Sequence, residues 1–433
     1  MAQMFLIAFR NLIQHSRRTL LLGGAIAGVT ALLVFLLCLS SGVHSTMLES
    51  ATTLMTGHLN VGGFYKVTAG QSAPLITGFE KINQLVHETL PDIDYVAVRG
   101  RGWAKLVSHA ASMQSAIGGI NIENEPGFIK VIHPLSGRLE DLAQPNTIIL
   151  FESQAKKLDV KVGDSVVISV LTARGVNNTV DVRVVAIAQE MGILSTFNVY
   201  VPEDSLRKLY QLNADSTGAL HVHLKDMRRI PENIGKLRKV LEENGYLLMD
   251  QSSKPFWEKL NSTKREDWTG QKLDLTSWED EMTFIRWAVT AVDGLMYILT
   301  VVLLIIIAIG IMNSMWIAIR ERTREIGTLR AIGMQRWRVL AMFVIEAFTL
   351  GSLGTTVGAV LGLLIALALN AAQLPVPEGA RMFLMASHLK LSFEPVRVLG
   401  GMLVITGCTT LIAIIPSLYA ARLKPISAMQ HIG

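Results

Sequence analysis

The chain has 433 residues, of which half are hydrophobic and 17% are charged, whereas about 25% of the residues of a typical soluble domain are charged. This composition, with a mean hydropathy of +0.39, excludes an ordinary soluble globular protein. The net charge of +5 does not indicate nucleic-acid binding, because the basic residues lie largely beside apolar runs, where they act as topology signals. We therefore expect a membrane protein with no nucleic-acid partner.

Residues 1–18, before the first apolar run, have the pattern of an amphipathic helix. Phe5, Phe9, Leu12 and Ile13 recur at helical spacing, and basic residues occupy other positions. This pattern favours an N-terminal helix that lies in the membrane interface on the cytoplasmic side. The alternative is a simple helical extension of the first span.

Four apolar runs are each long enough to cross a bilayer, which takes about 20 helical residues. The first exceeds the roughly 7–15 apolar residues of a signal peptide and is not followed by an A-x-A cleavage site, so we interpret it as a retained span. The predicted transmembrane helices are residues 19–42, 285–319, 339–371 and 398–421.

The long polar segment between the first two spans, residues 43–284, predicts a mixed α/β domain. Two strand–helix–strand units separated by an insertion indicate a split ferredoxin-like unit, and the insertion at about 118–215 is mainly β. The elements expected in the two units are strand 57–64, helix 79–90 and strand 94–100, then strand 219–224, helix 231–245 and strand 246–250.

This segment has no recognisable catalytic motif. It lacks H-E-x-x-H, paired cysteines and G-x-S-x-G. His221 and His223 would share one strand face, and we interpret them as solvent-facing strand residues rather than a metal pair. The chain is therefore not expected to be an enzyme, with no catalytic residues, no metal site and no cofactor of its own.

Lys and Arg in the short loops predict the orientation. The N-terminal segment, the loop 320–338 with its six arginines, and the tail 422–433 are all basic and would lie on one side of a four-span protein. We expect both termini in the cytoplasm, and the domain 43–284 and the loop 372–397 outside.

The third span carries two features that an inert span does not need. Gly354, Gly358 and Gly362 recur every four residues, which lets helix backbones approach closely; Gly24 and Gly28 form a shorter pattern in the first span. Glu346 is a carboxylate within the same apolar run. We interpret it as paired with an arginine or a helix end, with proton coupling as the alternative.

The loop 320–338 is ordered as a helix rather than as a solvated basic tail. Ile326, Leu329, Ile332 and Trp337 recur at near-helical intervals, and the charged residues fall mostly elsewhere. We interpret Gly327 and Gly333 as breaks in the helix that allow another surface to approach. An ordered amphipathic helix between two spans is a docking element.

Three stretches carry a family resemblance. RERTREIGTLRAIGMQRWRVLAMFVIEAFTLGSLGTTVGAVLG, AFRNLIQHSRRTLLL and PSLYAARLKPISAMQ resemble ABC-transporter permeases of the FtsX/MacB type. The segment GGINIE…ILFESQAKKLDVKVGDSVVIS is similar to the inserted external domain of that family. The chain has no G-x-x-x-x-G-K-[ST], so its organisation is closest to the lipoprotein-releasing LolC/LolE-like permeases, which use a separate ATPase.

The resemblance implies a dimeric inner-membrane permease that pairs with a copy of itself or with a paralogue, in contact with membrane lipid. A cytoplasmic ABC ATPase subunit would bind ATP and Mg and dock on the coupling helix 320–338. The implied contact residues are Glu325, Gly327, Leu329, Arg330, Ala331 and Gly333.

The activity implied is extraction of a lipoprotein or another amphipathic substrate from the outer leaflet, with a periplasmic carrier as a further partner. The residues expected near substrate access are Met47, Leu48, Met55, Phe284 and Trp287. The alternatives are mechanical activation of a periplasmic cell-wall hydrolase and efflux of peptides or drugs with an adaptor protein.

Overall fold

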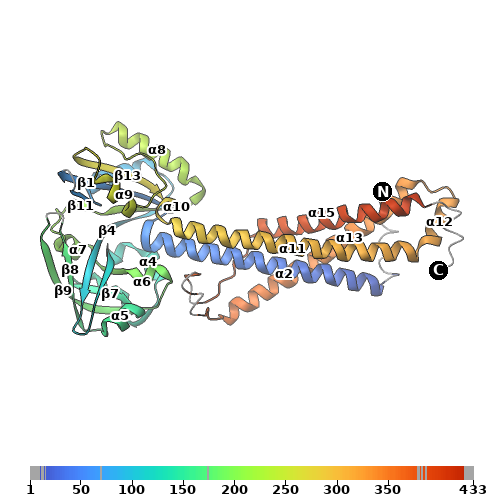
Figure 1. Ribbon diagram of the computed structural model, residues 1–433, viewed down its shortest axis with the longest axis horizontal. Helices are drawn as coiled ribbons and strands as arrows, with labels where there is room; N and C mark the ends of the chain where they lie inside the picture. Colours follow the sequence, from blue (N-terminus) through green and yellow to red (C-terminus); the bar gives the residue numbers. More distant parts are fainter. Residues whose placement is uncertain are drawn as a thin grey trace. The chain divides into compact units, whose positions relative to one another are not determined.

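The structure is a computed structural model that describes residues 10, 14, 16–68, 71–172, 175–377, 381, 384–385 and 388–423. The predicted apolar face at Phe5, Phe9, Leu12 and Ile13 lies outside these residues, as does the tail from residue 424. The chain forms two compact units: a helical unit of residues 1–45, 290–374 and 388–433, and a β-rich domain of residues 46–289 with 375–387. Figure 1 labels their elements.

Four long helices, each apolar enough to cross a membrane, form the helical unit. Each contains one of the four predicted spans. A short π-helix, η1 (Thr52–Thr56), continues the first of them as far as Gly57. The helices are α2 (Ser16–Ala51), α11 (Thr283–Glu321), α13 (Arg336–Ala372) and α15 (Pro395–Arg422).

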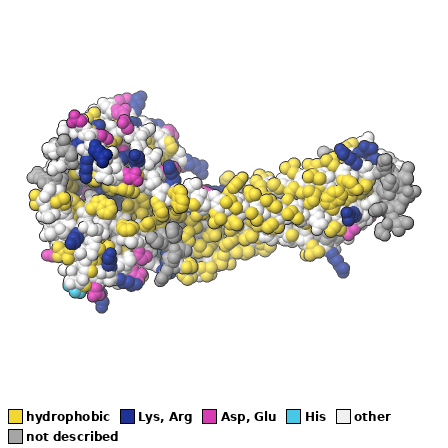
Figure 2. All heavy atoms as spheres, in the orientation of Figure 1, with side chains coloured by type: hydrophobic (Ala, Val, Ile, Leu, Met, Phe, Trp, Pro, Cys, Tyr) yellow, Lys and Arg dark blue, Asp and Glu magenta, His cyan; other side chains and the backbone are white. Residues whose placement is uncertain are grey.

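The helical unit buries an apolar core and leaves apolar side chains on its outside. Ile26, Ile311, Phe343 and Ile405, one from each long helix, belong to one buried cluster. Hydrophobic side chains also cover the visible face of the long helices (Figure 2), as expected for helices that contact hydrocarbon rather than water.

The β-rich domain contains the expected ferredoxin-like unit. Its strands lie in the order β13–β1–β12–β4, and every neighbouring pair is antiparallel. Helices α3 and α8 pack against each other and bury Ile82, Val86, Leu237 and Leu241, two residues from each helix at i, i+4 spacing. The elements are β1 (Leu59–Thr68), α3 (Phe79–Thr89), β4 (Ile93–Val107), β12 (Ala219–Leu224), α8 (Ile230–Glu243) and β13 (Gly270–Ser277).

The prediction of a strand at 246–250 was wrong. Within that segment only Leu248 makes an isolated bridge, to Leu273, and Leu247 is exposed. The fourth strand is β13, which follows the helix α9 (Phe256–Thr263) and buries Leu273 and Leu275. The apolar run after α8 was mistaken for this strand because it has the length and composition of a strand. In the sheet, β1 is already paired with β12 on one side and with β13 on the other.

The inserted part is mainly β, as predicted, but it begins before residue 118. The second half of β4 leaves β12 and pairs instead with β5 and β8. The strands of this part are β5 (Ser112–Ile120), β6 (Pro134–Gly137), β7 (Thr147–Phe151), β8 (Ser165–Leu171), β9 (Asn177–Ala188) and β10 (Asn198–Pro202). Its helices are α4 (Pro126–Val131), α5 (Glu152–Leu158), α6 (Ile193–Phe197) and α7 (Glu203–Leu209).

Short elements complete the domain. Strand β2 (Gln71–Ala73) pairs antiparallel with the end of β1, and β3 (Ile76–Thr77) pairs antiparallel with β11 (Ser216–Thr217). Three 3-10 turns are η2 (Ile122–Asn124), η3 (Leu139–Ala143) and η4 (Met227–Arg229), and the short helix α10 (Trp278–Glu281) precedes α11. The long strand β4 takes part in both halves of the sheet, so its residues 99–103 lie where the two halves meet.

Candidate functional site

The described residues contain no group of three or more His, Cys, Asp or Glu side chains that could hold a metal ion. The prediction that His221 and His223 face solvent was wrong, because both are buried on β12. His223 stacks on Tyr95 with ring centroids 4.2 Å apart, and His221 Nε2 lies 3.3 Å from the Arg101 guanidinium. Burial lowers the pKa of both imidazoles, that of His223 to about 3, so both are neutral structural residues at neutral pH.

An apolar cavity of about 280 Å³ lies within the β-rich domain. Met55 from η1 and Phe284 from the start of α11, two of the predicted access residues, both line it. The other lining side chains come from β4, β5, α6, β10, α9, α10, α11 and the residue between the last two helices: Trp103, Ala116, Ile193, Leu194, Phe197, Asn198, Phe256, Trp257, Glu281, Met282, Thr283 and Ile285, with backbone at Gly102. An apolar cavity walled by aromatic residues is typical of a site for hydrophobic ligands.

The remaining predicted access residues lie elsewhere. Met47 and Leu48 are buried in α2, and Trp287 is 70% exposed on α11; none of the three lines the cavity. The sequence located two of the segments that contribute to the cavity, those of Met55 and Phe284. It did not identify which of their faces point into it, because both segments are apolar on several faces.

A second cavity, of about 450 Å³, shares Gly102 and Trp103 with the apolar one. Its charged lining residues are Arg101 and Lys264, and no carboxylate lines it among the described residues. The rest of the lining is mixed. Aromatic and polar side chains contribute Tyr65, Gln71, Ser72, Thr172 and Tyr210, and aliphatic side chains contribute Ala73, Pro74, Leu75, Leu171, Leu212 and Leu260. We call this the cationic cavity.

Tyr210 fixes the backbone of the shared wall. Its hydroxyl accepts a hydrogen bond from Trp103 N at 2.8 Å and donates one to Trp103 O at 2.7 Å. Gly102 must be glycine, because a Cβ there would overlap the Tyr210 ring. The Trp103 side chain nevertheless remains 55% exposed. It can therefore contact a ligand while its backbone is held in place.

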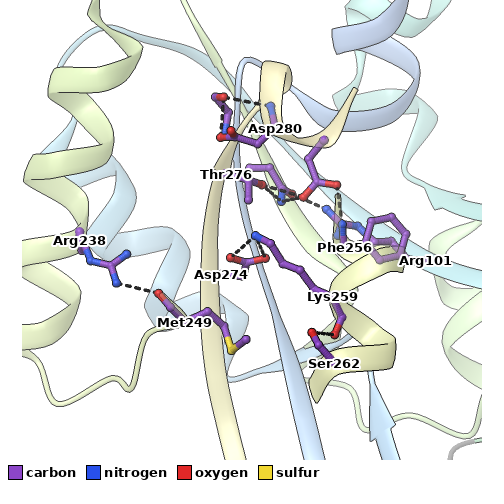
Figure 3. A network of polar contacts seen from close by, with 12 residues as sticks. Arg101, Arg238, Met249, Phe256, Lys259, Ser262, Asp274, Thr276 and Asp280 are labelled. Atoms are coloured by element: carbon purple, nitrogen blue, oxygen red, sulfur yellow. Dashed lines mark hydrogen bonds and ion pairs between the residues drawn. The ribbon is translucent and has the colours of Figure 1, made fainter. Parts of the chain in front are cut away.

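A buried polar network lies beside the apolar cavity (Figure 3). Glu281 accepts hydrogen bonds from Thr276 Oγ1 at 2.8 Å and from Phe256 N at 3.1 Å, and Lys259 pairs with Asp274 at 2.9 Å. Arg101 lies over the Phe256 ring, 4.5 Å from its centroid. Burial raises the pKa of Glu281 and of Asp274, against the opposing effects of Arg101 and Lys259, respectively.

A buried arginine joins the end of the first long helix to the sheet, a feature that the sequence analysis missed. Arg99 on β4 forms an ion pair with Glu125 and donates a hydrogen bond to the Thr53 carbonyl at 3.0 Å, and the Tyr200 hydroxyl donates to the Leu54 carbonyl at 3.1 Å. Both carbonyls belong to η1. The signal was present in the alternation of VRGRGW, which places Arg99 and Arg101 on the same strand face.

The loop between α11 and α13 is not a single helix over 320–338. Arg320 and Glu321 end α11, a separate helix α12 (Thr323–Ala331) follows, and α13 begins at Arg336. Gly333, at φ +104°, ends α12, whereas Gly327 is buried inside it and does not interrupt it.

The six predicted coupling residues differ in exposure. Glu325, Ala331 and Gly333 are exposed, Leu329 and Arg330 are half-buried, and Gly327 is buried. Ile326 is buried as well, and Ile332 is 80% exposed.

The predicted pairing of Glu346 with an arginine is confirmed. Arg322 Nη1 lies 3.1 Å from Glu346 Oε2, and both side chains are about 95% buried. Arg322 immediately precedes α12 and Glu346 lies on α13, so this ion pair ties α12 to a long helix.

The three glycines of α13 lie against α2. A Cβ built at Gly354 would come within 3.0 Å of Ile26, one at Gly358 would overlap the Ala27 carbonyl, and one at Gly362 would lie 2.6 Å from the Ala31 carbonyl. In contrast, nothing lies within 4 Å of a Cβ at Gly24 or Gly28, and both are exposed. The α13 glycines therefore occupy a close helix contact within the described residues, and those of α2 do not.

Two family models match the chain. A MacB-like periplasmic core domain matches residues 19–240, and an FtsX-like permease C-terminal domain matches residues 297–425.

The curated relatives match only part of the chain. The macrolide export ATP-binding/permease protein MacB of Bordetella avium is 32% identical over 32% of this chain and 19% of its own length. That of Escherichia coli O157:H7 is 35% identical over 31% of this chain and 19% of its own. The chain thus matches about a fifth of the length of these relatives.

Solved structures show weaker likeness. The periplasmic region of MacB from Actinobacillus actinomycetemcomitans is 14% identical, with 56% of this chain and 98% of that chain covered and a TM-score of 0.31. The extracellular domain of the ABC-type transporter YknZ from Gram-positive bacteria is 18% identical, with 43% and 95% covered and a TM-score of 0.30. On the match of the family models, the chain belongs to the ABC-transporter permeases of the MacB/FtsX type.

Proposed function

We propose that the chain couples ATP hydrolysis by a separate ABC ATPase, docked on α12, to extraction or translocation of an amphipathic substrate through the β-rich domain. The observation that carries this proposal is the apolar cavity, whose walls include Met55 of η1 and Phe284 of α11. Both segments are continuous with long apolar helices, so a displacement of those helices along their axes would change the shape of the cavity.

The exposed surface of α12 supports the docking site. Ile332 at its end is 80% exposed and carries no polar group, and Ala331 and Gly333 beside it are also exposed. The six arginines of 320–338 would hold this loop in the cytoplasm of an inner-membrane protein, with both termini on the same side and the β-rich domain in the periplasm. Arg322 and Glu346 would transmit a movement of α12 to α13.

A lipoprotein or another acylated molecule is the substrate that the sequence resemblance implies, and a periplasmic carrier would receive it. A second permease subunit, identical or paralogous, would complete the transmembrane part. Efflux of a macrolide or peptide with an adaptor protein is the second candidate, and the relatives named macrolide export proteins favour it.

The docking proposal is tested with Ile332→Asp in the full chain. We expect this variant to insert normally and to lose co-purification of an ABC ATPase, because a carboxylate would be buried in an apolar contact. It is a sharper test than a change at Gly333, where any side chain would be strained at φ +104°. The matched control is Val176→Asp, the same kind of change at an exposed residue of the β-rich domain.

Retention of the ATPase by Ile332→Asp would refute docking at this end of α12. With the ATPase bound, an acylated peptide that stimulates hydrolysis would support extraction, and stimulation by a macrolide alone would support efflux. Stimulation by neither, but by a cell-wall hydrolase, would replace transport with mechanical activation.

A further inference from the structure

We propose that the apolar and cationic cavities of the β-rich domain form one binding site for an anionic amphiphile. The hydrocarbon part would occupy the apolar cavity, and the anionic group would lie in the cationic cavity beside Lys264. This inference deepens the proposed function and rests on it only for the identification of the ligand as a substrate.

The two cavities together have the size of a ligand site. At about 280 and 450 Å³, they lie near the lower end of the roughly 300–1,000 Å³ of typical small-molecule sites, and the pair lies within that range. They are neighbours, because Gly102 and Trp103 line both of them. A single ligand molecule can therefore reach both.

The apolar cavity suits a hydrocarbon chain rather than a polar ligand. Among the described residues that line it, Glu281 is the only charged one, and its carboxylate already accepts hydrogen bonds from Thr276 and the Phe256 backbone. Phe197, Trp257 and Phe284 supply apolar walls that are still partly exposed in this structure. Covering those walls with a hydrocarbon chain would remove apolar surface from water, which favours binding.

The cationic cavity selects the charge of the other end of the ligand. Arg101 is compensated by Glu281 and Asp274 behind it, which act to keep it charged despite its burial. Lys264 is exposed at the cavity and forms no ion pair with any residue that the structure describes. With no described carboxylate in the lining, an anionic group would meet a cation there and no repelling charge.

Trp103 marks the boundary between the two ends of the ligand. Its backbone is held by the Tyr210 hydroxyl, and its indole is 55% exposed at the wall common to both cavities. An indole in such a place, with an apolar body and one N–H donor, suits the junction between a hydrocarbon chain and its polar group.

The test is photo-crosslinking of the full chain in nanodiscs of zwitterionic lipid. Three probes share one acyl chain with a terminal diazirine and differ in their head group: a fatty acid, a lysophosphatidylglycerol and a lysophosphatidylcholine. We expect both anionic probes to label, saturably, peptides that contain Phe197, Trp257 or Phe284. Stronger labelling by the fatty acid or by the lysophosphatidylglycerol would identify a carboxylate or a phosphate as the preferred head group.

Two variants separate the two halves of the site. Lys264→Glu should weaken labelling by the anionic probes about tenfold and leave the zwitterionic probe unchanged, because one attraction becomes a repulsion. Phe197→Asp, at a 54% exposed residue, should reduce labelling by all three probes. The matched control is Lys157→Glu on α5, an exposed lysine outside both cavities, which should change nothing.

Equal labelling by all head groups, or an unchanged anionic signal in Lys264→Glu, would overturn the assignment of the anionic group. Labelling confined to residues 19–42, 290–319, 339–371 and 398–421 of the long helices, or competition by butyrate as effective as that by a long-chain fatty acid, would overturn the amphiphile site itself. None of these measurements requires the ATPase. If the Ile332→Asp variant still binds the ATPase, the docking proposal fails, but the probes can still label the cavities. The two proposals can therefore fail separately.

Discussion

Among the described residues, the β-rich domain and the helical unit each bury an arginine–glutamate pair, and the two pairs differ in their surroundings. Arg99 and Glu125 lie in the β-rich domain, where Arg99 also donates to the Thr53 carbonyl while Arg99 Nε and Glu125 Oε1 have no hydrogen-bond partner. Arg322 and Glu346 lie in the helical unit, where Arg322 immediately precedes α12 and Glu346 lies in the first third of the transmembrane helix α13. The two ion pairs consist of the same chemical groups, but the unfolded state with which each folded pair is compared is different.

That difference determines what each pair contributes. An unfolded β-rich domain exposes both charges to water, so burying them carries a large desolvation penalty that only the intact pair offsets. In a membrane protein, separated helices still find polar partners at the bilayer surface, and measured side-chain hydrogen bonds between such helices average about 0.6 kcal/mol. We therefore expect the first pair to govern stability and the second to govern helix position.

Breaking the pair in the β-rich domain should give the largest effect. Arg99→Met should lower the free energy of unfolding of this domain by about 3–5 kcal/mol, because Glu125 is left buried without its partner. The measurement is urea-dependent hydrogen exchange of β4 and β12 peptides in the full chain. The double variant Arg99→Met/Glu125→Met is the control and should recover most of the loss; a loss below about 1 kcal/mol in the single variant would contradict the distinction between the two pairs.

The pair in the helical unit should show a smaller coupling. We expect a coupling energy of about 1–2 kcal/mol between Arg322 and Glu346 from the two single substitutions to methionine and their double variant, measured by unfolding in mixed micelles. The charge swap Arg322→Glu/Glu346→Arg should restore any ATPase coupling that Arg322→Glu abolishes. A coupling energy between Arg322 and Glu346 as large as that between Arg99 and Glu125 would contradict the proposed effect of the membrane on the unfolded state.

The pH dependence of the β-rich domain gives the smallest and most specific test. The pKa of His223 is lowered to about 3, mainly by burial and further by His58 and Arg99, so between pH 6.5 and 3 the unfolded chain binds a proton that the folded domain does not. The contribution of this histidine is present above pH 6.5 and is lost as the pH falls, at about 1.4 kcal/mol per pH unit.

His223→Gln removes this titration. Between pH 6.5 and 5.5 the wild type should lose about 1 kcal/mol more than this variant, because the unfolded histidine is already half protonated at pH 6.5; the measurement is urea unfolding at each pH. Parallel curves for the two proteins would show that His223 titrates as it would in water, which is the behaviour of the solvent-facing residue that the sequence suggested.

The errors of the sequence analysis have a common cause. Strand alternation showed that His221 and His223 share a face, but not that Arg101 and Tyr95 from β4 cover it. The apolar segments around Met55 and Phe284 were found, whereas Trp103 and Phe197 were not, because residues that line one cavity come from strands and helices far apart in the sequence. The sequence predicted a helix in the loop 320–338, but α12 covers only Thr323–Ala331. Its limits were misplaced because a 3.6-residue period does not show where one helix ends and the next begins.

The sequence alone determined that the chain has four membrane helices and one large α/β domain. Bilayer thickness fixes the length of an apolar span, and strand and helix periods are local properties of the chain. Only the tertiary structure decided that Arg99 holds the end of the first long helix, that Glu346 pairs with Arg322, and that two cavities meet at Trp103. The partner of a buried charged residue can lie in any segment that the fold brings within hydrogen-bond distance. A local sequence pattern therefore cannot identify that partner.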